Sequence, residues 1–250
     1  MQLEFSDHES RLTHFQARFT DHAFPTSSSM GPALETVVLV HGLWVHGIAM
    51  ELMRRRIARS GYRTLSYSYP SIRLTLTENA ERLARFCRGI AASRLHFVGH
   101  SLGGLIALRT LQQMTGLAAG RVVLLGTPFG ECHAARRLVR LPGGRAALGR
   151  SIPEWLEAAR PQFDGGHEIG VIAGSLPLGL GCIVAPDLPS PSDGVVTVAE
   201  TQVPGMRDHV VLHVSHSGML VSAAVARHIC AFLREGAFTK DEGGRRKDEA

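Results

Sequence analysis

The stretch that decides the fold of this chain is Leu95–Gly104, which reads LHFVGHSLGG. A short apolar run leads into Gly99-x-Ser101-x-Gly103, and a helix-forming run, residues 105–114, follows. This order is typical of a sharp strand-to-helix turn that holds its serine in a strained backbone conformation. The two glycines are needed because a side chain at either position would collide with the neighbouring strand or helix. We therefore expect the Ser101 hydroxyl to project above a sheet, at a helix N-terminus whose dipole favours negative charge.

On both sides of this turn, apolar runs that predict strands alternate with amphipathic runs that predict helices. An alternating order of apolar strands and helices predicts an α/β fold, a doubly wound and mostly parallel sheet with helices on both faces. The expected strands are residues 36–41, 62–67, 95–98, 121–125, 168–173 and 210–214. The expected helices are residues 48–59, 77–91 with Thr77 as N-cap, 101–114 and 217–233.

The composition of the chain divides it into three parts. Residues 1–34 are a polar lead-in, in which Met30 is an alternative start, and residues 236–250 form a charged tail that we expect to be disordered. Residues 35–235 then make one domain of ordinary size. Within it, residues 128–165 break the alternation with an arginine-rich amphipathic stretch, and we expect this insertion to form a short cap over a substrate pocket.

The net charge of +5 is mostly local, because it gathers in the insertion. A nucleic-acid partner is not expected, since no binding motif accompanies the charge. Two readings stay open: peripheral contact with an anionic membrane surface, or a solvated surface helix. The arginines concerned are Arg136, Arg137, Arg140, Arg145 and Arg150.

The cysteines are spaced singly, with no CxxC pair and no metal-ligand spacing. They predict reduced thiols in a cytoplasmic protein, and residues 1–20 lack the apolar segment of a signal peptide. We expect no metal, and the sequence predicts no oligomeric state. The cysteines are Cys87, Cys132, Cys182 and Cys230.

A serine hydroxyl is a weak nucleophile near neutral pH, so Ser101 needs a histidine base that a carboxylate orients. On this kind of sheet the chain order is serine, acid, histidine, with the histidine after the last strand. His216 fits this place, whereas His213 lies inside the expected strand and His209 at its start.

For the carboxylate, Asp193 fits best because it lies in a loop beyond the fifth strand, next to Gly194. Asp187 is the alternative, since it occupies the same loop. Asp208 and Glu200 are weaker candidates, and any loop aspartate can instead cap its own backbone.

An oxyanion formed at the serine needs two fixed N–H donors. One is expected from Leu102, directly after the serine, and the other from Leu43 in the loop His41-Gly42-Leu43-Trp44 after the first strand. Gly42 permits the tight turn and His41 holds the loop in a structural role. We expect three residues near the substrate pocket, although Trp44 is equally consistent with ordinary core: Gly42, Trp44 and His100.

The segments GHSLGG, HGLW, SDGVV and VSHSGML together resemble the serine esterases and lipases of the α/β-hydrolase superfamily, in particular small bacterial lipase-like hydrolases. The resemblance covers about residues 36–235. It implies Ser101 as nucleophile, Asp193 as orienting acid and His216 as base, with Leu43 and Leu102 as oxyanion donors and no cofactor.

The residues and the resemblance together predict a carboxylic-ester hydrolase that forms an acyl-serine on a small-molecule or lipid ester with an apolar acyl group. An acyltransferase or thioesterase using the same three residues is the alternative. A non-catalytic ligand-binding module is a third reading, because one fold can serve many functions.

Overall fold

The computed structural model describes residues 34–114, 119–163, 166–179 and 181–239. The expectations for the lead-in up to residue 33, for Met30 as a start and for the tail from residue 240 fall outside this part of the chain. Among the described residues, no helix combines the length and the apolar character needed to cross a membrane.

The core of the fold is one sheet in the order β2-β1-β3-β4-β5-β6, and every neighbouring pair in it is parallel. The strands are β1 (Thr36–Val40), β2 (Arg63–Tyr67), β3 (Leu95–His100), β4 (Ala119–Leu125), β5 (Ile169–Gly174) and β6 (Asp208–Leu212). The chain runs outward from β1 to β2 and then returns past β1 to β3. The carboxyl ends of β1 and β3 are therefore the point of reversal, where doubly wound sheets bind their ligands.

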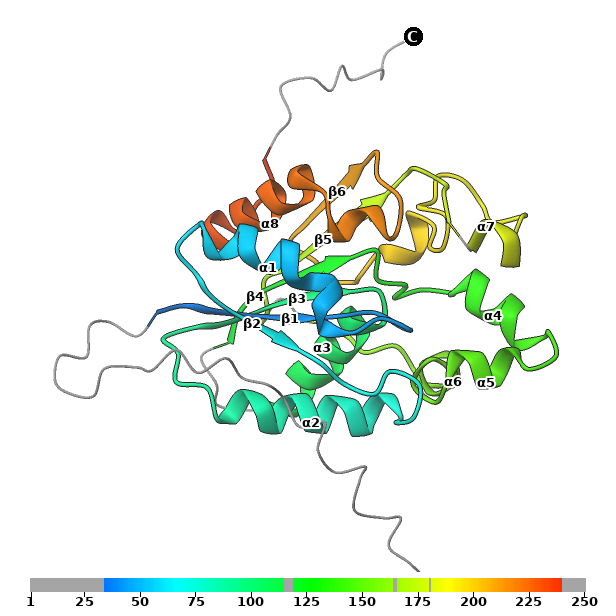
Figure 1. Ribbon diagram of the computed structural model, residues 1–250, viewed down its shortest axis with the longest axis horizontal. Helices are drawn as coiled ribbons and strands as arrows, with labels where there is room; N and C mark the ends of the chain where they lie inside the picture. The colour runs from blue at the N-terminus through cyan, green and yellow to red at the C-terminus, as the bar shows by residue number, and fades with distance from the viewer. Residues whose placement is uncertain (1–33, 115–118, 164–165, 180, 240–250) are drawn as a thin grey trace, which may run out of the picture. The chain divides into compact units, whose positions relative to one another are not determined.

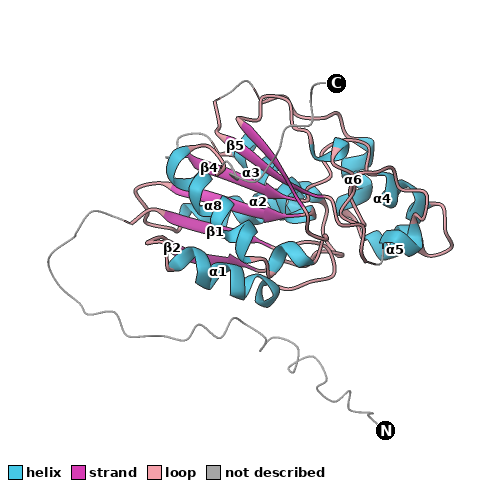
Figure 2. Ribbon diagram, turned by 90° about the horizontal axis from the view of Figure 1, so that it is seen from above, coloured by secondary structure: helices cyan, strands magenta, loops and turns pink. Residues whose placement is uncertain are grey.

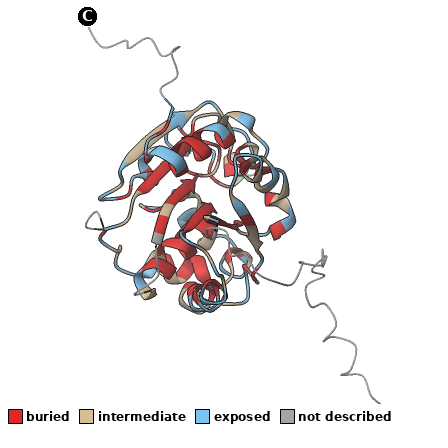
Figure 3. Ribbon diagram, turned by 90° about the vertical axis from the view of Figure 1, so that its left-hand side faces the viewer, coloured by how far each residue is buried: buried red, intermediate tan, exposed pale blue. Residues whose placement is uncertain are grey.

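Helices cover both faces of the sheet, with α1 and α8 on one face and α2 and α3 on the other (Figure 1). Alternate residues of β1 point to opposite faces, so Val38 and Val40 join the core beneath α2 and α3, while Val37 and Leu39 join the core beneath α1 and α8. Figure 3 shows the buried strands between these helix layers. The predicted doubly wound α/β fold is thus confirmed. The helices are α1 (Glu51–Ala58), which follows the 3-10 turn η1 (Gly47–Met50), α2 (Leu76–Arg88), α3 (Leu102–Gln113) and α8 (Ala223–Glu235).

Two predicted helix starts are wrong. The N-cap of α2 is Thr75 rather than Thr77, because the Thr75 hydroxyl accepts from the Glu78 N–H while the Glu78 carboxylate accepts from the Thr75 N–H. The last helix does not begin at residue 217: η3 (Gly218–Leu220) comes first, and Ser222 caps α8 by accepting from the Val225 N–H.

The insertion between β4 and β5 contains three short helices beyond the carboxyl edge of the sheet (Figure 2). They are α4 (His133–Val139), α5 (Gly144–Leu148) and α6 (Ser151–Glu157). The short helix α7 (Gly181–Val184) and the 3-10 turn η2 (Ala199–Thr201) lie in the long connection from β5 to β6. We call residues 128–163 the cap.

The described chain starts and ends near the opposite, amino edge of the sheet. Leu34 comes directly before β1, and the C-cap of α8, Gly236, accepts from Arg207 Nε at 2.8 Å, one residue before β6 begins. The four cysteines are all described, and none of them lies in a disulfide in this structure.

Candidate active site

Ser101 lies in the turn between β3 and α3, with φ 53° and ψ −122°. This conformation is strained for a residue with a side chain, as the sequence predicts. A Cβ atom at Gly99 would lie 2.5 Å from the Cα of Gly104, and one at Gly103 would overlap the carbonyl oxygen of Val40. Strand, turn and helix therefore pack so closely that the serine has no room to leave this geometry.

His216 and Asp193 meet at the carboxyl edge of the sheet. The Nδ1 of His216 lies 2.7 Å from Oδ2 of Asp193, and the His216 N–H donates to the Asp193 carbonyl at 2.9 Å. The other carboxylate oxygen accepts from the N–H groups of Val195 at 2.9 Å and Val196 at 2.7 Å. Asp193 is fully buried. Since a carboxylate accepts, the Nδ1 of His216 carries the proton and its Nε2 is left free to accept one.

The other candidate acids lie elsewhere. Asp187 is exposed and pairs with Arg137 at 2.8 Å, Asp208 accepts from the N–H groups of His209 and Phe238, and Glu200 binds residues of the cap. The structure therefore brings only Asp193 of these carboxylates to His216.

The other histidines also lie apart from Asp193. His209 is in β6, where its Nε2 lies 3.2 Å from Thr201 Oγ1, and His213 is exposed just beyond that strand.

His100 supports His216 from below. Its Nε2–H donates to the His216 carbonyl at 3.0 Å, and the two rings lie 4.6 Å apart between centroids. Burial, together with the neighbouring His216, lowers the pKa of His100 to about 3. His100 is therefore a neutral part of the framework, although it also lines the cavity described below.

Gly126, directly after β4, is a site residue that the sequence analysis missed. Its φ is +50°, and a Cβ there would lie 2.8 Å from Asp193 Oδ2 and 3.0 Å from His216 Nδ1. The position accommodates only glycine, because a side chain would separate the acid from the histidine. The only sequence signal for it is a glycine at the end of a predicted strand.

The loop after β1 lies against the serine. A Cβ atom at Gly42 would be 3.1 Å from the Ser101 Cβ. The backbone N–H groups of Leu43 and Leu102, on the two sides of Ser101, have no hydrogen-bond acceptor within the described chain. Unpaired N–H donors beside a nucleophile are suited to binding an oxyanion.

His41 holds this loop from inside the protein, as expected. The Tyr69 N–H donates to His41 Nε2 at 3.3 Å, so Nδ1 carries the proton and donates to the Gly42 carbonyl at 2.9 Å. The Tyr69 hydroxyl donates to the His41 carbonyl at 2.8 Å, and the two rings stack with centroids 4.3 Å apart. His41 is fully buried and does not line the cavity.

A cavity of about 350 Å³ opens beside Ser101 and His216. Its walls are almost entirely apolar and come from the loop after β1, from the cap and from the connection after β5. Trp44 is a wall residue but not core, since it is 51% exposed, and Gly42 does not line the cavity. The apolar side chains that the cap contributes are Pro128, Ala134, Ala135, Leu138, Leu148 and Ile152.

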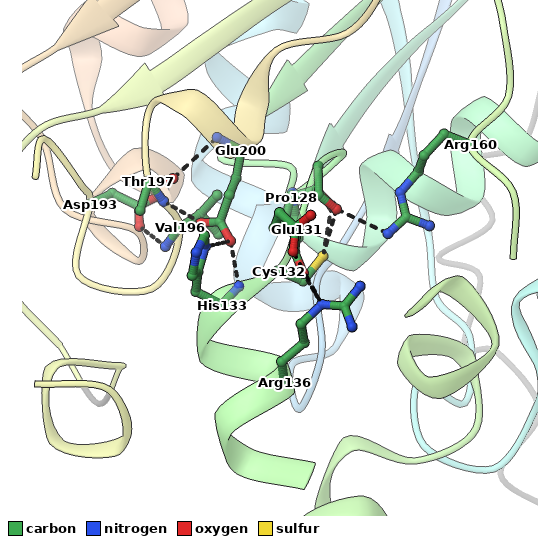
Figure 4. Close-up of polar contacts among 11 residues, drawn as sticks. Pro128, Glu131, Cys132, His133, Arg136, Arg160, Asp193, Val196, Thr197 and Glu200 are labelled. Carbon is green, nitrogen blue, oxygen red and sulfur yellow. Dashed lines mark hydrogen bonds and ion pairs between the residues drawn. The ribbon is translucent and has the colours of Figure 1, made fainter. Parts of the chain in front are cut away.

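One end of the cap is fixed by the buried carboxylate of Glu200. It accepts from both the N–H and Nδ1 of His133, at the start of α4, and from the Thr197 N–H at 2.7 Å (Figure 4). Because Thr197 lies four residues beyond Asp193, Glu200 joins the cap to the loop that carries this acid.

Four of the arginines in the cap form exposed ion pairs. The distances from guanidinium nitrogen to carboxylate oxygen are 3.6 Å for Arg136, 2.8 Å for Arg137, 3.1 Å for Arg145 and 3.6 Å for Arg150. Such pairs contribute little to stability, since water screens them. Most of the local positive charge is thus neutralised within the protein.

No group of three or more His, Cys, Asp or Glu side chains in the described ranges could hold a metal ion. The site is accordingly a serine with a polarised histidine, two free N–H donors and an apolar cavity.

Residues 37–228 match the sequence profile of the alpha/beta hydrolase family. No curated protein matches the chain. Among solved structures, the mature lipase BlEst2 of Bacillus licheniformis is 18% identical with a TM-score of 0.65, covering 83% of this chain and 95% of its own. The metagenomic carboxyl esterase MGS0156 is 19% identical with a TM-score of 0.56, covering 78% and 68%. The pyrethroid hydrolase of Sphingobium faniae JZ-2 is 14% identical with a TM-score of 0.51, covering 80% and 98%.

Proposed function

The chain belongs to the alpha/beta hydrolase family, and from this premise we propose that it is a serine-dependent carboxylic-ester hydrolase. Its substrate in this proposal is a small-molecule or lipid ester with an apolar acyl group. The similar structures are those of a lipase, a carboxyl esterase and a pyrethroid hydrolase, and they support this class of reaction.

The reaction begins when the Ser101 hydroxyl attacks the ester carbonyl and His216 Nε2 takes its proton. Asp193 stabilises the imidazolium that forms and keeps the ring in the required tautomer. In the described chain the Ser101 hydroxyl makes no hydrogen bond, which leaves it free to turn toward His216 once a substrate fills the cavity.

The carbonyl oxygen becomes an oxyanion, which the N–H groups of Leu43 and Leu102 stabilise. His216 then returns its proton to the leaving alcohol, and the acyl group stays on Ser101. A water molecule, deprotonated by His216, releases the acid and restores the serine.

The observation that carries this proposal is the 2.7 Å contact between Asp193 and His216 on the same cavity as a strained Ser101. A buried carboxylate that orients a histidine beside a half-buried serine at a cavity matches the requirements of nucleophilic catalysis. The apolar lining supports an apolar acyl group, because polar substituents there would lose their water without gaining partners.

A fluorophosphonate probe tests the proposal directly, because it reacts with activated serines. We expect it to label the wild-type chain and not Ser101→Ala, and we expect Ser101→Ala to lose at least about 10⁴-fold of the esterase rate. Ser217→Ala is the matched control, since Ser217 also lines the cavity. An unlabelled wild-type chain would contradict the proposal and favour a ligand-binding module. Product analysis with added alcohol separates hydrolysis from acyl transfer.

A further inference from the structure

The backbone of Trp44 is strained although its side chain is half exposed, so packing in the core does not account for the strain. Its backbone φ is +60°, in the left-handed region that residues with side chains rarely adopt, and its side chain is 51% exposed. A backbone of this kind persists only where surrounding contacts fix it. The contacts that fix Trp44 should therefore be specific.

Two hydrogen bonds hold Trp44, and they reach two different segments. Its backbone N–H donates to the hydroxyl of Ser71, in the loop after β2, at 3.3 Å. Its indole N–H donates to the carbonyl of Ala147, in α5 of the cap, at 2.8 Å. Ser71 is itself buried, so the first bond has little competition from water.

The two segments are also joined to each other. The Arg150 N–H donates to the Ile72 carbonyl at 3.0 Å, and a Cβ at Gly149 would lie 2.5 Å from the Ile72 Cα. We call the contact of Trp44, Ser71, Ile72 and residues 147–150 the junction. It connects the loop after β1, the loop after β2 and α5.

Leu43, the residue before Trp44, carries one of the two N–H donors assigned to the oxyanion. If the Trp44 backbone left the left-handed region, the peptide group that joins Leu43 to Trp44 would turn. The Leu43 backbone, which carries the N–H donor, would then shift away from the oxyanion. The indole bond to Ala147 exists only while α5 sits on the junction. Contact with α5 therefore helps to hold the residue that follows this donor.

We infer that Trp44 is a positioning residue, which aims the Leu43 N–H through its bonds to Ser71 and to α5; this inference rests on the proposed function. The oxyanion exists only in the transition state and the intermediate. Displacement of the Leu43 N–H should therefore lower kcat and leave KM nearly unchanged.

Trp44→Phe keeps the ring as a cavity wall and removes only the indole donor. With p-nitrophenyl butyrate we expect kcat to fall about tenfold, the effect of one lost hydrogen bond, with KM within about twofold. Butylboronic acid, which forms a tetrahedral adduct on the serine, should bind more weakly by the same factor. Ser71→Ala should lower kcat in the same way, while Ser71→Thr, which keeps the hydroxyl, should retain the rate.

The double variant Trp44→Phe/Ser71→Ala should lose little more than the worse single variant, because both changes release the same loop. Ile48→Ala, an exposed apolar residue four positions on, is the control and should behave as wild type. Thermal unfolding shows that each variant folds.

The inference would be overturned if the variants changed KM alone. It would also be overturned if the kcat losses of the two single variants multiplied in the double variant. Trp44 would then be only a wall of the cavity. If the wild type is active and labelled, and Trp44→Phe and Ser71→Ala keep the wild-type kcat, this inference fails while the ester-hydrolase proposal stands. A wild-type chain without activity or label would overturn the ester-hydrolase proposal and this inference with it.

Discussion

The carboxyl edge of the sheet and the cap above it are held by different kinds of contact. At the edge, Asp193 and His216 are buried, and His100, the last residue of β3, donates to the His216 carbonyl. The cap carries exposed ion pairs on its surface, but apolar side chains such as Trp155 anchor it in the core beneath α2 and α3. Directed bonds of Glu200 and Trp44 add to this anchorage. The comparison indicates that buried polar bonds keep the reacting groups of the edge in one geometry, whereas apolar burial and a few directed bonds hold the cap.

The largest expected effect comes from breaking the edge. Asp193→Asn keeps the shape of the side chain but favours the wrong tautomer of His216, so we expect kcat to fall about 10⁴-fold. Asp187→Asn is the matched control, because this exposed residue pairs with an arginine instead. The measurement is the steady-state rate of ester hydrolysis. Equal losses in the two variants would contradict the assignment of Asp193.

The next largest effect is a pH dependence of the stability, which we expect from His100, the residue that bonds to the His216 carbonyl. Burial lowers the pKa of His100 to about 3 in the folded protein, whereas an unfolded histidine titrates near 6.5. Below about pH 6.5 only the unfolded chain takes up this proton, so stability falls as the pH falls toward 3. We expect His100 to contribute a loss of about 2–3 kcal/mol between pH 7 and pH 4.5.

Urea unfolding at these two pH values measures this loss, and His100→Gln should reduce it while keeping a donor for the His216 carbonyl. Burial also lowers the pKa of His41, of His96 and of His209, so part of the pH dependence should remain. An unchanged pH dependence in His100→Gln would show that His100 is protonated as readily in the folded chain as in the unfolded one.

The smallest effects compare two contacts within the cap. Glu200→Ala leaves the buried N–H of Thr197 without its acceptor, so we expect a loss of about 1–3 kcal/mol in the free energy of unfolding. Arg137→Ala removes an exposed pair and should cost no more than about 1 kcal/mol. Urea unfolding of both variants gives the two values. A larger loss for Arg137→Ala would mean that surface pairs, rather than the buried carboxylate, fix the cap.

The sheet could be predicted because its signals are local. A few consecutive residues suffice to predict each element, as in the apolar β-branched run 36–40 and the Gly99-x-Ser101-x-Gly103 turn. The N-cap of α2 was missed although its signal is equally local, since Thr75 and Glu78 have the spacing of a capping box.

The site beyond Ser101 depends on contacts that local patterns do not contain. Asp187 and Asp193 share one loop, and only the folded chain shows that the second lies next to His216. Glu200 and His133 are 67 residues apart, and Trp44 and Ala147 are 103 apart. No pattern in the sequence links such pairs, so the cap contacts could not be foreseen.

The places where the described residues begin and end have a practical consequence. All strands run parallel, so Leu34 and the end of α8 lie about one strand length, ~17–20 Å, from the edge that carries the serine. A solid support, a fluorescent label or a fused protein attached beside Leu34 or Thr239 would leave the entrance to the cavity unobstructed. Immobilised preparations linked there should keep their access to bulky esters, whereas linkage through the cap would block it.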